Sequence, residues 1–216
     1  MQASRLAEHS IVRSFTIRGV PETTPRFFFA AMSPYSWLAS ERIGELLPQA
    51  RWRGVLAGAV FQANERVPWS LGEDKALGMA DCEARAAGYG LGTIRWPDPW
   101  PTSDLRAGRA MAYAESLGLL EPFALAAMRL AFLEGRNLEE LETVIEAGRR
   151  VGIDPAVLAE AISEQRIKDA LRAVTGEAIE LGVYGVPTVA VGDQLFWGDD
   201  RLEEAVAAHQ GLAGSP

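Results

Sequence analysis

RFFFAAMSPYSWLASERIGELL, residues 26–47, is the stretch that decides the fold of this chain. Its apolar run, residues 27–32, ends at Ser33-Pro34, and apolar residues at helical spacing follow. Ser33 suits the N-cap of that helix, and Pro34 suits its first turn. The stretch therefore predicts a strand that feeds a helix. The hydroxyls of Ser33 and Ser36 would lie beside the free backbone N–H groups of the helix N-terminus, a place that attracts anions.

The composition predicts a globular protein with a small-molecule ligand. The chain has 216 residues, and 48% of them are hydrophobic, which is enough for a well-buried interior. Its 21 Lys and Arg residues stand against 29 Asp and Glu residues, for a net charge of −8, and the basic residues are dispersed along the sequence. This charge pattern argues against nucleic acid and against an anionic membrane as partners.

Targeting features and cysteine use indicate a cytoplasmic protein. No segment has the roughly 20 consecutive apolar residues that a membrane span needs. Residues 1–25 carry charges and lack the apolar core of a secretory signal. The one cysteine, Cys82, excludes an internal disulfide and agrees with a reducing compartment. With two histidines, neither a metal site nor a Ser-His-Asp triad has evident parts.

The middle of the chain changes from strand to helix patterns. Residues 50–57 alternate as a second strand would, which gives a strand–helix–strand start. From there to residue 181, glycine and proline separate segments of helical periodicity, and four glycines stand where C-terminal caps belong. The expected helices are residues 73–89, 104–117, 122–134, 138–151, 155–164 and 165–181, and the expected cap glycines are Gly118, Gly135, Gly152 and Gly182.

The C-terminal part returns to strands. Residues 188–191 and 195–197 flank a short turn and fit a β-hairpin, and a closing helix is predicted at residues 200–208. The order predicts an α/β protein, a thioredoxin-like fold with an all-helical domain inserted between its βαβ and ββα halves. Open α/β sheets bind ligands beyond the carboxyl ends of their strands, which is where the Ser33 turn would lie.

This interpretation divides the chain into three parts. Residues 26–60 and 183–212 would together form a discontinuous thioredoxin-like domain, and residues 61–182 would form the helical insertion. Residues 1–25 are either an extra edge strand or a loose extension, and the sequence leaves both open.

Four segments carry a family resemblance. FFFAAMSPYSWLAS, GVLAGAVFQANERVP, IRWPDPWP and YGVPTVAVGDQLFWGDDRLEEA together resemble the 2-hydroxychromene-2-carboxylate isomerase family, in the same order and from about residue 26 to residue 210. That family is a glutathione-dependent branch of the DsbA-like thioredoxin proteins and is close to the kappa-class glutathione transferases. The resemblance implies glutathione as cofactor, a small hydrophobic or aromatic substrate, and a homodimer.

Ser33 is the catalytic residue that the resemblance implies. Disulfide oxidoreductases of this fold carry Cys-x-x-Cys at the turn, whereas Ser33 and Ser36 replace both sulfurs with hydroxyls, so redox cycling at this turn is excluded. A serine hydroxyl can donate a hydrogen bond to a glutathione thiolate, and the helix N-terminus favours the negative charge. The simpler alternative is that Ser33 is only a helix cap.

The resemblance also implies the glutathione-binding residues. The Val186-Pro187 bond is expected to be cis, with the Val186 backbone pairing with glutathione as an added strand would. Asp199 and Asp200 open the last helix, where backbone N–H groups would hold the γ-glutamyl carboxylate and Asp200 its ammonium group. Relatives usually have an uncharged residue at Asp199, so a second carboxylate there would repel the ligand. Asn64 matches a glutathione-contacting amide. Without the resemblance, the aspartates are plain helix starters and Asn64 a turn residue.

A loop rich in tryptophan and proline is expected to form the second-substrate pocket. Trp96 and Trp100 offer flat apolar faces to an aromatic substrate, with Tyr35 and Ser103 beside them. The alternative is that the tryptophans pack the two domains together. Isomerase relatives often carry Asn at Ser103 and Asp at Ala30, so this chain departs from them at both positions.

The proposed activity is therefore a glutathione-dependent cis–trans isomerisation of a conjugated substrate. The first alternative is conjugation by a kappa-like glutathione transferase, since both reactions need the same activated thiolate. Two other classes are a thiol–disulfide oxidoreductase, which the absence of a cysteine near the turn argues against, and a binding protein that has lost the chemistry.

Overall fold

Four strands form one mixed sheet in the computed structural model, which describes residues 24–213. β1 (Arg26–Phe29) pairs in parallel with β2 (Arg51–Gly54) and antiparallel with β3 (Thr188–Val191). β4 (Gln194–Trp197) pairs antiparallel with β3, so that the strand order is β2-β1-β3-β4. The predicted βαβ start and the C-terminal hairpin are both confirmed.

The apolar run of the opening segment is the centre of the core. Phe27, Phe28 and Phe29 are fully buried. The rings of Phe27 and Phe29 stack 5.2 Å apart, and Trp52 of the neighbouring strand meets them edge-on at 5.1 and 5.2 Å. Because β1 has neighbours on both edges and is covered on both faces, its sequence is continuously apolar rather than alternating.

α1 follows β1 as predicted, and the helical segments of the middle region are confirmed with small shifts at their ends. Ser33 is the N-cap of α1, and Pro34 is its first residue. The four predicted cap glycines have positive φ, between 71° and 81°. The helices are α1 (Pro34–Leu46), α3 (Lys75–Gly88), α4 (Leu105–Ser116), α5 (Leu120–Phe132), α6 (Leu141–Arg150), α7 (Pro155–Ala161) and α8 (Gln165–Glu180).

Three features of the fold differ from the prediction. α2 (Ala57–Ala63) and the short 3₁₀ helix η1 (Trp69–Leu71) were not expected, and the second strand ends at Gly54 because the chain turns into α2. The closing helix is longer than predicted, since the 3₁₀ turn η2 (Asp199–Arg201) leads into α9 (Leu202–Ala213). α2 is short and carries one fully buried side chain, Val60, so its apolar periodicity was too weak to recognise.

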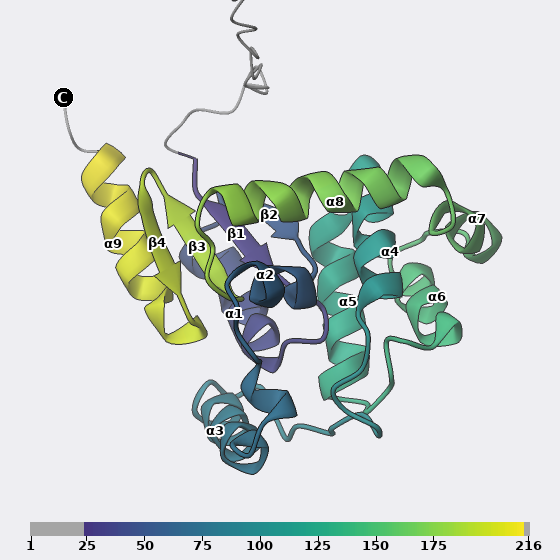
Figure 1. Ribbon diagram of the computed structural model, residues 1–216, viewed down its shortest axis with the longest axis horizontal. Helices are drawn as coiled ribbons and strands as arrows, with labels where there is room; N and C mark the ends of the chain where they lie inside the picture. The colour runs from purple at the N-terminus through teal and green to yellow at the C-terminus, as the bar shows by residue number, and fades with distance from the viewer. Residues whose placement is uncertain (1–23, 214–216) are drawn as a thin grey trace, which may run out of the picture.

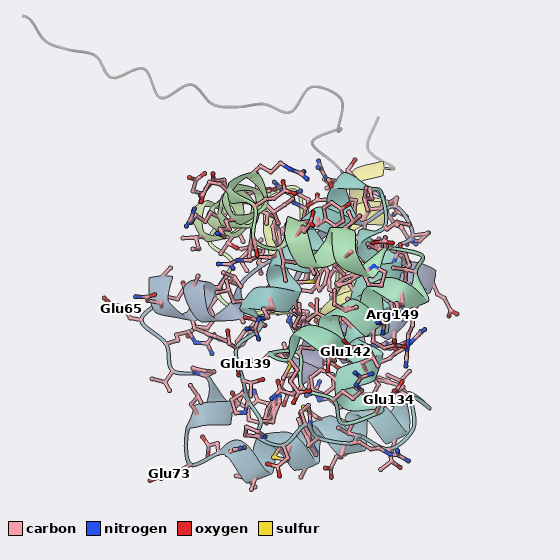
Figure 2. The ribbon with its side chains drawn as sticks, turned by 90° about the vertical axis from the view of Figure 1, so that its right-hand side faces the viewer. Glu65, Glu73, Glu134, Glu139, Glu142 and Arg149 are labelled. Atoms are coloured by element: carbon pink, nitrogen blue, oxygen red, sulfur yellow. The ribbon has the colours of Figure 1, made fainter. Side chains whose placement is uncertain are left out.

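Figure 1 shows how these elements are arranged. β4 and α9 lie at one end of the molecule, and the helices α4 to α8 gather at the other. The rest of the sheet and α1 lie between these two ends, and α3 lies below α1. Charged residues cover the outside of the helical part: in Figure 2, Glu142 and Arg149 lie on the same exposed side of α6, and they form an ion pair of 2.9 Å.

The two expectations for residues 1–25 fall on a segment that lies, up to residue 23, outside the described residues. Within residues 24–213, no helix is both long enough and apolar enough to cross a bilayer.

Candidate functional site

A cavity of about 900 Å³ opens beside the N-terminus of α1. Its walls come from the turn after β1, the start of α2, the α2–α3 connection, the α3–α4 connection, and the loops that flank β3 and β4. It lies at the carboxyl end of β1, the position where α/β sheets bind ligands. The predicted site residues that line it are Ser33, Tyr35, Trp100, Ser103, Val186, Pro187, Asp199 and Asp200.

Ser33 presents a hydroxyl to this cavity. Its Oγ accepts a hydrogen bond from the Ser36 backbone N–H at 3.2 Å, the capping interaction that the sequence predicts. Ser36 points the other way: it is fully buried, and its Oγ accepts the Ala30 N–H at 3.3 Å. Within the described part of the chain, the Ser33 hydroxyl proton has no acceptor, so the group can donate to a ligand.

The Val186-Pro187 peptide bond is cis, as expected, and both residues line the cavity. The Pro187 carbonyl accepts the Gly198 N–H at 3.0 Å, which ties this loop to the end of β4. No residue in the 24–213 range bonds to the backbone N–H or carbonyl of Val186. The N–H and carbonyl of Val186 are therefore without a backbone partner in the described chain. The resemblance implies that they pair with an extended ligand as a neighbouring strand would.

Asp199 and Asp200 line the cavity in different environments. Asp199 is 1% exposed, and its carboxylate lies 3.1 Å from Arg85 and 3.0 Å from the Tyr89 hydroxyl. Burial raises the pKa of Asp199, and the Arg85 charge opposes that shift. Asp200 is exposed and also lies 3.1 Å from Arg85. Arg85 therefore neutralises much of the negative charge that the sequence places at this helix start.

Tyr35 is held by a hydrogen bond at the cavity wall. Its hydroxyl donates to Asp81 of α3 at 2.7 Å, and its ring meets Trp69 edge-on at 5.8 Å. Burial and the Asp81 hydrogen bond raise the pKa of Tyr35. Cys82 is fully buried next to it, and burial raises the pKa of the Cys82 thiol to about 12. Cys82 is the small buried side chain that its helical position predicts.

Two predicted site residues do not line the cavity. The Asn64 amide donates to the carbonyls of Val60 and Val183, at 2.9 and 3.1 Å, and so joins the end of α2 to the segment before β3. Trp96 packs behind the wall, with its ring 4.6 Å from Trp100 and its Nε1 donating to Glu83 at 2.7 Å. The loop thus combines both expected roles, because Trp100 borders the cavity and Trp96 packs against it.

Sequence reasoning missed three residues of the site. Trp69 in η1 lies 5.8 Å from Tyr35 and 5.5 Å from Trp100, and so completes an aromatic wall. Arg66 lies over Tyr184 at 3.8 Å and Trp197 at 4.7 Å, and it donates to the Tyr184 carbonyl at 3.0 Å. No ion pair joins Arg66 to an acid among residues 24–213. The available signal was their position: Arg66 lies within the GVLAGAVFQANERVP segment, and Trp69 directly follows it.

Asp104 is the third site residue that sequence reasoning missed. Its position before α4 suggested only the start of a helix, yet it lines the cavity together with Ala57 at the start of α2. Burial raises the pKa of Asp104 to about 6, although its hydrogen bonds from backbone N–H groups oppose the shift. A carboxyl group that titrates near neutral pH therefore lies in the wall of the cavity.

The fold and the site define the chain as a DsbA-type thioredoxin protein in which the turn before α1 carries the hydroxyls of Ser33 and Ser36. Residues 26–210 match the DSBA-like thioredoxin domain, and the chain belongs to that family. It is similar to a 2-hydroxychromene-2-carboxylate isomerase of Sphingobium xenophagum, 28% identical over 82% of this chain and 93% of that protein. The Pseudomonas putida isomerase of the same name is 25% identical over 82% of this chain and 89% of that protein.

Solved structures agree with the fold. A 2-hydroxychromene-2-carboxylate isomerase superposes with a TM-score of 0.75 at 22% identity, over 88% of this chain and 95% of that chain. A probable DsbA oxidoreductase from Streptomyces coelicolor has a TM-score of 0.70 at 17% identity, over 89% of this chain and 91% of that chain. The predicted thioredoxin-like fold and the resemblance to the isomerase family are both confirmed.

Proposed function

We propose that this protein is a glutathione-dependent cis–trans isomerase that acts on a conjugated aromatic or hydrophobic substrate. Glutathione would bind in the cavity, and its thiolate would add reversibly to the conjugated double bond. The former double bond then rotates as a single bond, and expulsion of the thiolate returns the other isomer. The isomerase relatives support the reaction class.

The observation that carries the proposal is the position of Ser33. Its hydroxyl has no acceptor in the described chain, lines the cavity and stands at the N-cap of a 13-residue helix. A thiolate next to it would receive one hydrogen bond and the favourable field of the helix N-terminus. Both effects lower the pKa of the thiol and raise the fraction of nucleophile near neutral pH.

Groups around Ser33 match the other parts of glutathione. The unpaired Val186 backbone would bind the cysteinyl backbone, with Pro187 beside it, and Asp200 would pair with the γ-glutamyl ammonium group. Asp199 would act indirectly, because its ion pair fixes the position of Arg85 in the cavity wall. Arg66 offers a positive charge without an acidic partner in residues 24–213, which suits a carboxylate of the tripeptide. Asn64 would act indirectly, by fixing the end of α2 from which the Arg66 segment starts.

The second substrate would lie against the aromatic wall. Trp69 and Trp100 border the cavity together with the exposed apolar side chains of Val67 and Leu71. Flat apolar faces of this kind favour an aromatic or otherwise hydrophobic molecule. Ser103 lines the same part, although its Oγ already accepts the Leu105 N–H at 3.3 Å.

Calorimetric titration of glutathione, with the ultraviolet absorbance of the thiolate read in each complex, tests the proposal. We expect the wild type to bind glutathione with a thiolate signal near neutral pH, and Ser33→Ala to lose that signal. Ser163→Ala, at an exposed position between α7 and α8, is the matched control and should behave as wild type. Absence of binding at millimolar glutathione would refute the proposal. Product analysis with a conjugated substrate then separates isomerisation from conjugation.

A further inference from the structure

The acids that line the cavity differ in what they contact. Asp199 and Asp200 both lie 3.1 Å from Arg85, and Asp74 is exposed at the start of α3. Asp104 is partly buried, and no cation among the described residues forms an ion pair with it. It is therefore the one cavity acid, within residues 24–213, that is partly buried and has no ion-pair partner.

The topology brings Asp104 to the same end of the sheet as Ser33. Ser33 follows β1, and Ala57 follows β2, the parallel neighbour of β1. The Val55 N–H bonds the Phe29 carbonyl at 2.8 Å, which holds the two strand ends together. Asp104, Ala57 and Ser33 all line this cavity, so the Asp104 carboxyl group shares it with the Ser33 hydroxyl.

We propose that Asp104 is the general acid of the site, which protonates the oxygen of the intermediate formed when the thiolate adds. This inference rests on the proposed glutathione-dependent function, for a substrate whose double bond is conjugated to a carbonyl group. The thiolate sulfur bonds the β-carbon, the double-bond electrons move towards the carbonyl oxygen, and Asp104 gives that oxygen its proton to form an enol. After rotation, the Asp104 carboxylate takes the proton back, the carbonyl reforms and the carbon–sulfur bond breaks. No proton or electron is gained or lost over the cycle.

A partly buried carboxyl group suits this role because it keeps its proton to higher pH than an exposed one. The other ionisable side chains that line the cavity are Tyr35, Arg66, Asp74, Arg85, Asp199 and Asp200. None of them hydrogen-bonds or pairs with Asp104 in the described chain, and α2, which packs beside it, carries no ionisable side chain. Titration of Asp104 should therefore follow its own burial rather than the charge of a neighbour.

The test uses the full chain with glutathione and cis-benzylideneacetone, a conjugated aromatic ketone, and follows formation of the trans isomer by absorbance. General acid catalysis contributes about 10²-fold or more, so Asp104→Asn should lower kcat by about that factor. Glutathione affinity should not change. In the wild type, kcat should fall as the pH rises above about 6, because the ionised carboxylate has no proton to give. The amide can still hydrogen-bond but cannot transfer a proton, so the variant should lose this limb of the pH profile.

Asp98→Asn is the matched control, because Asp98 is an exposed acid in the same connection and does not line the cavity. Wild-type kcat and an unchanged pH limb in Asp104→Asn would overturn the inference. So would a wild type that binds glutathione with a thiolate signal yet does not isomerise the ketone, and this result would leave the glutathione site intact. Loss of glutathione binding in the wild type would refute the proposed function itself.

Discussion

Asp104 gives the sharpest stability prediction, because its carboxyl group is ionised in the unfolded chain at a pH where the fold favours the protonated form. Its pKa rises from 3.8 to about 6 on folding, and burial is the main cause. Well below pH 3.8 the group is protonated in both states and costs nothing. The cost grows as the pH rises from 3.8 to 6, and at pH 7 and above the fold carries nearly the full cost of burying the charge. A shift of about two units corresponds to ~3 kcal/mol.

Asp104→Asn should remove this pH dependence. The amide does not titrate, and its oxygen can still accept a hydrogen bond from a backbone N–H. Relative to wild type, the variant should be within about 1 kcal/mol at pH 4 and more stable at pH 7, by up to ~3 kcal/mol less the loss of the stronger bonds to an ionised acceptor.

Urea unfolding at pH 4, 5, 6 and 7, followed by tryptophan fluorescence, measures this difference. The difference between variant and wild type cancels the other carboxyl groups, which titrate in both proteins. Asp193→Asn, at the exposed β3–β4 turn, is the control for the loss of one negative charge. A pH-independent difference for Asp104→Asn, or a variant less stable than wild type at pH 7, would show that burial does not raise this pKa.

Three further predictions each concern the environment of one position in the fold. Arg85→Met should destabilise the fold by about 3 kcal/mol at pH 7 in urea unfolding, because it leaves Asp199 buried without its cation, and part of the loss should be recovered at low pH as Asp199 protonates. An equal loss of folding stability at pH 7 and at low pH would contradict this account. Cys82 should resist thiol reagents until the protein unfolds, since it is buried and its pKa is about 12; fast labelling of the native protein would be the opposite result. Gly118→Ala should cost about 1–2 kcal/mol through its φ of 72° alone, as nothing crowds the site, whereas Gly176→Ala inside α8 should gain about 0.5–1 kcal/mol.

The fold was predictable because its deciding signals are local. An apolar run before Ser33-Pro34 predicts a strand and a capped helix, and positive φ at four glycines ends four helices at the expected places. α2 and η1 escaped prediction because each is held by what it packs against rather than by its own periodicity. η1 depends on Trp69 meeting Tyr35 and Trp100, residues far from it in the sequence.

The site was predictable only in part, for a related reason. Ser33, Val186 and Asp200 stand at ends of strands or helices, and the topology alone brings such positions together. Arg66 and Asp104 lie in connections between helices, and their roles depend on where those connections cross the cavity. Asn64 shows a second limit: the resemblance predicted an amide that contacts glutathione, whereas in the fold this amide donates to the carbonyls of Val60 and Val183 and does not line the cavity.

The resemblance implies an uncharged residue at position 199, where this chain has an aspartate. The ion pairs around Arg85 change what this difference means for the site. From sequence, a second carboxylate at the start of the last helix should repel the carboxylate of glutathione. In the fold, Asp199 is buried against Arg85 and Tyr89, and Arg42 donates to its backbone carbonyl at 3.0 Å, so its charge is already matched. Because Arg85 belongs to α3, Asp199 ties that helix to the end of β4. Asp199 therefore joins two walls of the cavity. Under the proposed function, Arg85→Met should weaken glutathione binding more than Asp199→Asn does.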